Sequence, residues 1–93
     1  MKSFEIQYHK AKNAANKLKH KGLSLAETEP VFHDERALTL RDDHHDEPRW
    51  ITIGLDGKGR LLVVAYTYRE PNFVRVISAR LASKNERRQY LEA

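Results

Sequence analysis

The chain has no cysteine among its 93 residues, which excludes a disulfide framework and any zinc site built on thiolates. No apolar run approaches the ~18 residues that a membrane-spanning helix needs. The opening stretch MKSFEIQYHKAK lacks the apolar segment of a secretory signal peptide. No repeat, low-complexity tract or linker divides the sequence. We therefore expect a single domain over residues 1–93, located in the cytoplasm and without contact to a membrane.

Signatures of covalent and nucleotide-dependent catalysis are also missing. There is no G-x-S-x-G motif and no Walker loop, and the glycine-rich DGKG at 56–59 is typical of a hairpin turn. One acidic, histidine-containing stretch has metal-ligand chemistry. Its members are His33, Asp34, Asp42, Asp43, His44, His45 and Asp46. Adjacent His44 and His45 do not easily converge on one ion, so a solvated loop is favoured, and we expect no metal and no cofactor.

Charge is segregated along the chain although the net charge is only +4. Residues 1–22 carry six lysines and one glutamate, a net charge of +5. Residues 23–48 carry two arginines and eight acidic residues, a net charge of −6, and residues 49–93 carry nine basic and four acidic residues, a net charge of +5. This basic–acidic–basic order favours a face that binds a polyanion, while a mixed, well-solvated surface is the plainer alternative.

Periodicity predicts an α+β fold. The expected elements, in order, are a strand at 4–8, a helix over 11–18, a helix over 24–32, a short strand at 37–40, a loop at 41–48, strands at 49–55, 60–69 and 72–79, and a helix from 83. The strand at 60–69 is apolar on both faces and is expected in the middle of the sheet. The predicted fold class has two N-terminal helices and a C-terminal helix packed on one face of an antiparallel sheet of about four strands.

The helices carry two further signals. Alanines and a leucine at i, i+3, i+4 and i+7 (Ala11, Ala14, Ala15, Leu18) predict the buried stripe of the first helix, with Gly22 as its stop. Asn13, Asn16 and His20 gather on the opposite side and are expected to point away from the core. The spacing S-x-x-E, at Ser24–Glu27 and again at Ser83–Glu86, predicts a capping box at each of the other two helices.

Basic side chains occur at the ends of the expected elements. The set comprises Lys19, His20, Arg49, Arg75, Arg80, Arg87 and Arg88. Arg75 lies in the middle of a strand between apolar neighbours, so either that face is open and contacts a ligand, or an acidic side chain pairs with Arg75. The planar guanidinium group binds phosphate through two charge-assisted hydrogen bonds. A phosphodiester site and ordinary surface charge both remain open for each residue taken singly.

The sequence resembles the BrnT family of toxins from type II toxin–antitoxin modules. The matching segments are a stretch rich in lysine, alanine and asparagine that ends at Lys19-His20, V-F-x-D at 31–34, R-W-I-T-I-G at 49–54, and V-I-S-A-R-x-A-S-x-x-E-R-R-x-Y at 76–90. They stand in the family's order over nearly the whole chain, and the last is the most specific. The sequence departs from the family pattern in two places, F-E-I-Q-Y at 4–8 and an extra Lys21 in K-H-K-G.

The resemblance implies a fold like that of the RelE ribonucleases and an RNA-cleaving toxin that inhibits translation. It also implies a BrnA-like antitoxin with a DNA-binding domain, which neutralises the toxin in a heterotetramer. RNA cleavage by attack of a 2′-OH group needs a base, an acid and cations around the phosphorus, and needs no metal. We assign His20, Arg49, Arg80 and Glu86 to this catalytic site, and Lys19, Arg75, Arg87, Arg88 and Tyr90 to binding of the RNA. The capping role of Glu86 competes with its catalytic one.

Two other functional classes stay open at this point. A non-catalytic module that binds nucleic acid or another protein predicts salt-sensitive binding without cleavage products, although no helix-turn-helix, zinc finger or aromatic RNA-binding motif supports it. A small metal-dependent enzyme predicts that a chelator abolishes activity.

Overall fold

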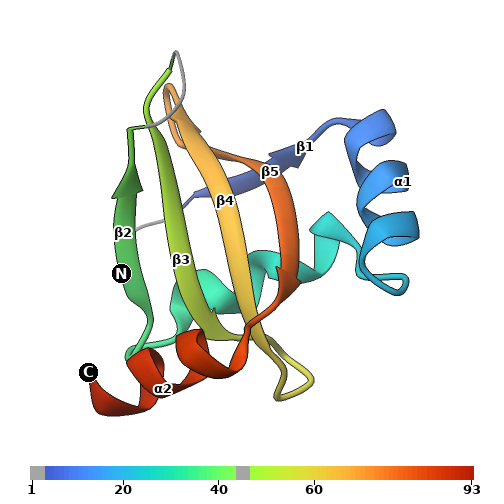
Figure 1. Cartoon of the computed structure of the whole chain (residues 1–93). Helices are drawn as coiled ribbons and strands as arrows, with labels where there is room; N and C mark the ends of the chain where they lie inside the picture. The colour runs from blue at the N-terminus through green and yellow to red at the C-terminus, as the bar shows by residue number, and fades with distance from the viewer. Residues whose placement is uncertain (1–3, 44–46) are drawn as a thin grey trace.

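The computed structural model describes residues 4–43 and 47–93. Its elements follow the order β1 (Glu5–Tyr8), α1 (Lys10–Lys19), the 3₁₀ helix η1 (Leu25–His33), β2 (Leu38–Asp42), β3 (Arg49–Leu55), β4 (Leu61–Arg69), β5 (Phe73–Leu81) and α2 (Lys84–Glu92). The strands form one sheet in the order β1-β5-β4-β3-β2 (Figure 1). None of the helices within these ranges is long and apolar enough to cross a membrane.

The predicted fold class is wrong in three respects. The sheet has five strands rather than about four, because the predicted strand at 4–8 joins it as β1. The sheet is also mixed, because β1 pairs in parallel with β5 while the other pairs are antiparallel. The second N-terminal helix is a 3₁₀ helix with Pro30 inside it, a residue that lacks the N–H an α-helix interior requires. The helices also lie on both sides of the sheet: η1 passes behind the strands, and α2 crosses in front of their ends (Figure 1).

The central position predicted for the strand at 60–69 is confirmed. β4 lies between β3 and β5, and six of its nine residues are buried. Side chains on its two faces belong to two separate hydrophobic clusters. Leu62, Val64 and Tyr66 join the larger cluster with η1, whereas Leu61 and Val63 join a smaller cluster with Tyr90 of α2. The sheet therefore has a face covered mainly by η1 and an opposite face that α2 covers at one end.

The predicted orientation of α1 is reversed. Ala11, Ala14, Ala15 and Leu18 are exposed, Leu18 to 90%, and Asn16 is the one buried residue of the helix. Asn16 is 5% exposed and makes three side-chain hydrogen bonds to backbone atoms, two with Ala79 and one with Leu23. Because these bonds use both N–H groups of the amide and give its oxygen a donor, the polar side of α1 can face the protein.

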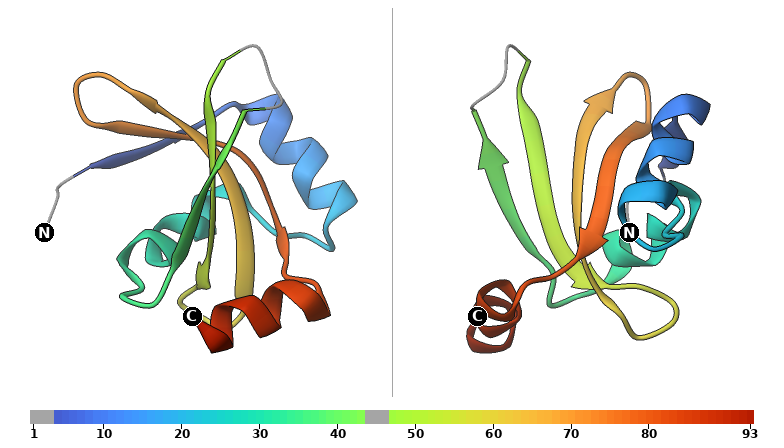
Figure 2. Two further views of the ribbon diagram at one scale, coloured as in Figure 1. Left: turned by 60° about the vertical axis from the view of Figure 1, so that its left-hand side comes forward. Right: turned by 45° about the vertical axis from the view of Figure 1, so that its right-hand side comes forward.

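α1 occupies an edge of β5 that β1 leaves open. β1 pairs with only the first four residues of β5, from Phe73 to Val76. Beyond this point, Ala79 N–H donates to Asn16 Oδ1 at 3.0 Å, and Asn16 Nδ2 donates to Ala79 O at 2.9 Å. Figure 2 shows α1 alongside β5 in this position. The Asn16 side chain thus supplies the hydrogen bonds that another strand residue would supply.

η1 packs closely on β3 at Gly54. A Cβ atom at this position would lie 3.1 Å from both Val31 Cγ1 and Val31 O, so glycine allows the helix to approach. The predicted capping box of this helix is not formed. Ser24 accepts a hydrogen bond from Ala26 N–H instead, and Glu27 pairs with Arg60 at 2.6 Å. Glu27 is drawn toward the β3–β4 turn, where Arg60 also binds Asp56 at 2.7 Å.

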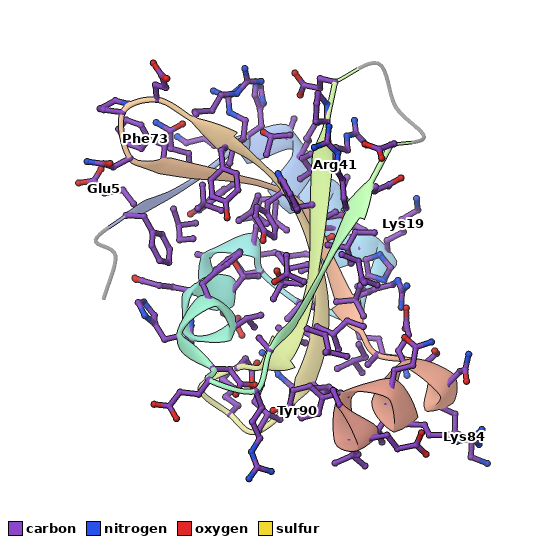
Figure 3. All side chains as sticks on the ribbon, turned by 90° about the vertical axis from the view of Figure 1, so that its left-hand side faces the viewer. Glu5, Lys19, Arg41, Phe73, Lys84 and Tyr90 are labelled. Atoms are coloured by element: carbon purple, nitrogen blue, oxygen red, sulfur yellow. The ribbon has the colours of Figure 1, made fainter. Side chains whose placement is uncertain are left out.

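The C-terminal capping box is confirmed. Ser83 accepts from Glu86 N–H, and Glu86 accepts from Ser83 N–H. The predicted turn residues 41 and 42 extend β2, so the loop begins later than expected. Tyr90 fastens the far end of α2, because its hydroxyl donates to Asp34 Oδ2 at 2.6 Å. Figure 3 shows Tyr90 at the α2 end of the sheet and Arg41 toward the opposite end of β2.

Candidate functional site

Three of the arginines predicted for the site lie on the same face of the sheet, the one that α2 covers at one end. Residues opposite each other in antiparallel strands point to the same side. Arg80 lies opposite Val63, a member of the cluster with Tyr90. Arg75 lies opposite Thr67. Trp50 of β3 pairs with Tyr66 of β4, so Arg49, one residue before Trp50, lies beside Thr67 on the other side of β4. We call the side that carries Arg49, Arg75 and Arg80 the arginine face.

A β-bulge brings Arg75 and Arg80 to this common face. They stand five positions apart in β5, and a regular strand would point them to opposite sides. Tyr66 pairs with Val76 and Ala65 pairs with Ser78, so Ile77 is an extra residue between them. Such an insertion shifts the alternation by one position. Val76 before the bulge and Ala79 after it both belong to the η1 cluster, which fits this shift.

Polar residues cross the arginine face in one row over all five strands. The row consists of Asp42 of β2, Arg49 of β3, Thr67 of β4, Arg75 of β5 and Gln7 of β1. Thr67 is 4% exposed, and its buried Oγ1 has no hydrogen-bond partner within the described protein. Such an unsatisfied hydroxyl is unusual and costs stability. The row therefore has a buried polar centre between two arginines.

Arg75 differs from other strand arginines in its surroundings. Arg41, Arg69 and Arg80 each contact a carboxylate, of Asp43, Glu47 and Glu86 respectively. Arg75 is exposed and has no carboxylate within ion-pair distance in the described ranges 4–43 and 47–93. Of the two alternatives for this residue, an open face and an acidic partner, the structure has the open face.

Arg80 is held by the first turn of α2. Its Nη1 and Nη2 donate to Glu86 Oε1 and Oε2 at 2.7 and 2.8 Å, and Nη1 also reaches Leu81 O at 3.3 Å. Glu86 Oε1 simultaneously accepts Ser83 N–H at 2.8 Å. The bidentate bond to Arg80 lowers the pKa of Glu86 to about 2, with Ser83 adding to the effect, and raises the pKa of Arg80. Both groups are therefore ionised at neutral pH.

The structure separates Arg80 from Arg49, which the sequence suggested as joint ligands of one phosphate. Arg80 lies opposite Val63, and Arg49 lies beside Thr67, four residues further along β4. Four residues of strand span roughly 13 Å. Arg49 and Arg75, by contrast, flank the same residue of β4. The arginine face thus offers two cationic positions, one at Arg80 and one along the polar row.

The remaining predicted residues lie at three different places. Lys19 and His20 stand at the end of α1; His20 is half-buried, and its N–H donates to Asn16 O. Arg87 and Arg88 are exposed on α2. Tyr90 is only 8% exposed and packs with Ile53 and Val63, so its position is in the core rather than on a surface that RNA would contact.

Asp34 anchors Tyr90 and belongs to the framework behind the site. Its carboxylate accepts bonds from Tyr90 Oη and from the N–H groups of Leu55 and Arg36. Burial alone would raise the pKa of Asp34, but these hydrogen bonds outweigh it and leave the pKa below its usual value. The same bond to Asp34 raises the pKa of Tyr90.

The acidic stretch does not assemble a metal site in the described part of the chain, where no three potential ligands of the His, Asp and Glu types come together. His33 instead stacks on Phe4, with ring centroids 5.3 Å apart. His44, His45 and Asp46 lie outside the described residues.

A cavity of about 980 Å³ lies at the η1 side of the sheet, and its lining includes none of Arg49, Arg75 and Arg80. Its lining includes Phe4, Phe32, Tyr66 and Tyr68, and a chain of hydroxyl groups links Thr39, Thr52 and Tyr66. The arginine of this lining, Arg69, is paired with Glu47, and the lining also includes the carboxylates of Asp34 and Glu70. The arginine face therefore suits a phosphodiester better.

Sequence reasoning missed Thr67 and Gln7. Both look like ordinary strand residues, and only the pairing of β4 and β1 with β5 places them beside Arg75. The polar neighbours of a functional arginine in a sheet come from other strands, so no local signal marks them.

A protein family and a solved structure resemble this chain. Residues 8–86 match the model of a family described as the ribonuclease toxin, BrnT, of type II toxin–antitoxin systems. The crystal structure of the Brucella abortus ribonuclease toxin BrnT superposes with a TM-score of 0.69 and 22% sequence identity, covering 88% of this chain and all of the Brucella chain. No curated protein sequence matches the chain.

Proposed function

Because the chain belongs to the BrnT family of ribonuclease toxins of type II toxin–antitoxin systems, we propose that it is an endoribonuclease that cleaves RNA and thereby inhibits translation. The observation that carries this proposal is the convergence of Arg49, Arg75 and Arg80 on one face of the sheet, which depends on the bulge in β5. A polyanionic substrate is the ligand that such a face attracts.

The proposed reaction needs no metal. The 2′-OH of a nucleotide attacks the adjacent phosphorus, the bond from phosphorus to the 5′-oxygen breaks, and a 2′,3′-cyclic phosphate and a 5′-hydroxyl are formed. One protein group takes the proton from the 2′-OH, and another returns a proton to the leaving oxygen. Negative charge builds up on the phosphorus oxygens meanwhile, and a guanidinium placed there stabilises it.

In this mechanism Arg80 stabilises the charge on the phosphorus, and Glu86 positions Arg80. A carboxylate with a pKa of about 2 is a poor proton acceptor at neutral pH. Its two hydrogen bonds fix the plane of the guanidinium instead, and they leave Arg80 Nε able to donate to the phosphate. His20 is our candidate for proton transfer. It follows Asn16 by one helical turn, and Asn16 is hydrogen-bonded to Ala79, the residue before Arg80.

The test compares Arg80→Ala with Arg41→Ala. Arg41 is also a strand arginine with a carboxylate partner, but it lies opposite Trp50 with its guanidinium over the indole ring, away from the arginine face. We expect Arg80→Ala to reduce cleavage of a single-stranded RNA by roughly 10²–10³-fold. Arg41→Ala should cleave at close to the wild-type rate, and EDTA should leave the wild-type rate unchanged.

Three results would contradict this proposal. Normal cleavage by a folded Arg80→Ala protein would remove Arg80 from the site. Loss of activity in EDTA that Mg²⁺ or Zn²⁺ restores would point to a metal-dependent enzyme. Salt-sensitive RNA binding by the wild-type protein without cleavage products would identify a binding module instead.

The proposal extends to the cellular partner. A toxin of a type II system has a cognate antitoxin protein, and we propose that this partner is BrnA-like, carries a DNA-binding domain and forms a heterotetramer with the toxin in the cytoplasm. Expression of the chain alone should stop bacterial growth and degrade RNA, and co-expression of the neighbouring small gene should restore growth. Unchanged growth with the chain alone would count against an active toxin.

A further inference from the structure

We propose that a hollow at the end of β1 is a second phosphate site, which binds the RNA backbone away from the phosphodiester that is cleaved. This inference rests on the proposed function, because it assigns an additional contact to the same substrate. The hollow has a volume of about 410 Å³ and is lined by Ile6, Gln7, Tyr8, His9 and Arg75.

The lining is suited to an anion. Arg75, Gln7 and His9 all offer N–H donors, and no carboxylate lines the hollow. The acidic residue of β1 is Glu5, which lies on the same side of the strand as Gln7 but two rows further along, where it pairs with Phe73, and it does not line the hollow. A phosphate would therefore meet donors without meeting a like charge.

Arg75 is available for such a ligand. It is exposed and has no carboxylate partner in the part of the chain that the structure describes, whereas Arg80 is engaged in two bonds with Glu86. An arginine without an acidic partner can form a bidentate bond to phosphate without first breaking an ion pair. Gln7 lies directly across from Arg75 in the β1–β5 register, so both side chains reach the hollow from neighbouring strands.

Positive charge continues beyond the hollow. His9 is the N-cap residue of α1, and its side chain makes no capping hydrogen bond. The first turn of α1 has no acidic residue and contains Lys10 and Lys12. The N-terminal end of this helix adds its partial positive charge to that of Arg75.

The position of the hollow shows that it serves a different phosphate from Arg80. Arg75 lies opposite Thr67 and Arg80 lies opposite Val63, so the two arginines are separated by roughly 13 Å along the strands. Arg80 is also held toward α2 by its two bonds to Glu86, so we assign the two arginines to different phosphate groups. A strand of RNA whose reacting phosphate is at Arg80 can follow the arginine face toward the polar row and place another phosphate at Arg75.

Binding of an uncleavable RNA tests the site separately from catalysis. The full-length protein is titrated into a fluorescein-labelled 12-nucleotide RNA with 2′-O-methyl groups throughout, and anisotropy is followed at several salt concentrations. We expect Arg75→Ala to weaken binding by roughly tenfold at low salt. The slope of log K against log salt should fall by about 0.7, the value for one phosphate of a single strand.

Two further variants separate a local contact from a general effect of charge. Gln7→Glu places a carboxylate in the hollow and should weaken binding at least as much as Arg75→Ala. Arg41→Ala removes the same charge from the other face of the sheet and should leave the dissociation constant within twofold of wild type. Circular dichroism of each variant establishes that it is folded.

The outcomes distinguish this inference from the proposed function. Wild-type affinity and salt slope in both Arg75→Ala and Gln7→Glu would overturn the second phosphate site, even if unmodified RNA is cleaved. Weakened binding in both variants, with no cleavage of unmodified RNA by the wild-type protein, would support the site and overturn the nuclease. A wild-type protein that does not bind the RNA at all would overturn both.

Discussion

Asn16 and Ala79, which are 63 positions apart in the sequence, are joined by two hydrogen bonds that replace a missing strand. The Asn16 carboxamide donates to the Ala79 carbonyl and accepts from the Ala79 N–H at the edge of β5. Its nitrogen also donates to Leu23 O at 3.0 Å, at the turn that follows α1. One side chain thereby fixes the sheet edge, α1 and the start of η1 relative to one another.

Replacement of Asn16 should be strongly destabilising. Asn16→Ala leaves one N–H and two carbonyl groups without these partners, and we expect a loss of about 3 kcal/mol or more in the free energy of unfolding. In a chain of this size, this corresponds to a fall in melting temperature of more than ~10 °C. Thermal denaturation followed by circular dichroism measures the change.

Leu18→Ala is the matched control on the same helix. Leu18 is 90% exposed, so its loss should change stability by less than ~0.5 kcal/mol. If Leu18→Ala were the more damaging substitution, α1 would be oriented as its apolar periodicity suggests, and not as described above.

The Arg80–Glu86 pair predicts a specific dependence of stability on pH. The pKa of Glu86 is lowered from 4.5 to about 2 in the folded protein. Because the folded value lies below the unfolded one, this stabilisation is fully present above pH ~4.5 and is lost as the pH falls toward 2. Urea denaturation at a series of pH values between 2 and 7 should show stability decreasing through this window.

Glu86→Gln is informative because glutamine can keep the capping bonds of α2 but not the charge. The variant should lose the contribution of Glu86 to the slope between pH 4.5 and 2, since it has no carboxyl group to titrate. It should also lower kcat more than it raises KM, because Arg80 is no longer held in one orientation. An unchanged pH profile together with unchanged kinetics would show that the pair has no positioning role.

Thr67→Val should stabilise the protein. The Thr67 hydroxyl is buried and has no hydrogen-bond partner among residues 4–43 and 47–93, and valine has nearly the same shape without the polar atom. We expect a gain of about 1 kcal/mol in the free energy of unfolding, measured by urea denaturation. A clear loss of stability would mean that the hydroxyl has a partner in solution, such as an ordered water molecule.

Tyr90→Phe separates a core role from a role in RNA binding. The variant keeps the ring but loses the 2.6 Å bond to Asp34, which retains two backbone donors. We expect a loss of about 1.5 kcal/mol in stability and no change in RNA affinity. A selective loss of RNA affinity with normal stability would show that the Tyr90 hydroxyl takes part in RNA binding.

Local sequence signals predicted most elements but not how they meet. The β3–β4 turn, the central position of β4 and the capping box at Ser83 depend on neighbouring residues, and each is present. The parallel β1–β5 pair joins segments separated by most of the chain, so no local pattern predicts it. For α1, periodicity showed which side was apolar, but three hydrogen bonds of Asn16 determine which side faces the protein.

For the candidate site as well, the sequence indicated the residue types but not their arrangement. The sequence indicated arginines suited to phosphate and left two alternatives for Arg75. The lack of a carboxylate within ion-pair distance of Arg75 among the described residues decides between them. The sequence could not show that Arg49 and Arg80 lie in different rows, because that depends on the registers of two strand pairs. The ion pair between Arg80 and Glu86 arises because the chain turns into α2 within a few residues of β5.

The extra residue in β5 has a consequence for comparing this chain with its relatives. Arg75 and Arg80 share a side only because their odd spacing is offset by Ile77. A relative without the bulge must therefore have an even number of steps between the equivalent arginines to display both together. An alignment with such a relative needs a one-residue gap at Ile77, so that the two arginines of each chain are matched. Without the gap, a surface arginine of one chain would be matched with a buried position of the other. Deleting Ile77 from this chain would remove the bulge and leave four steps between Arg75 and Arg80, so both would stay on the arginine face. A regular β5 that kept Ile77 would instead turn Arg80 toward the side now occupied by Ala79.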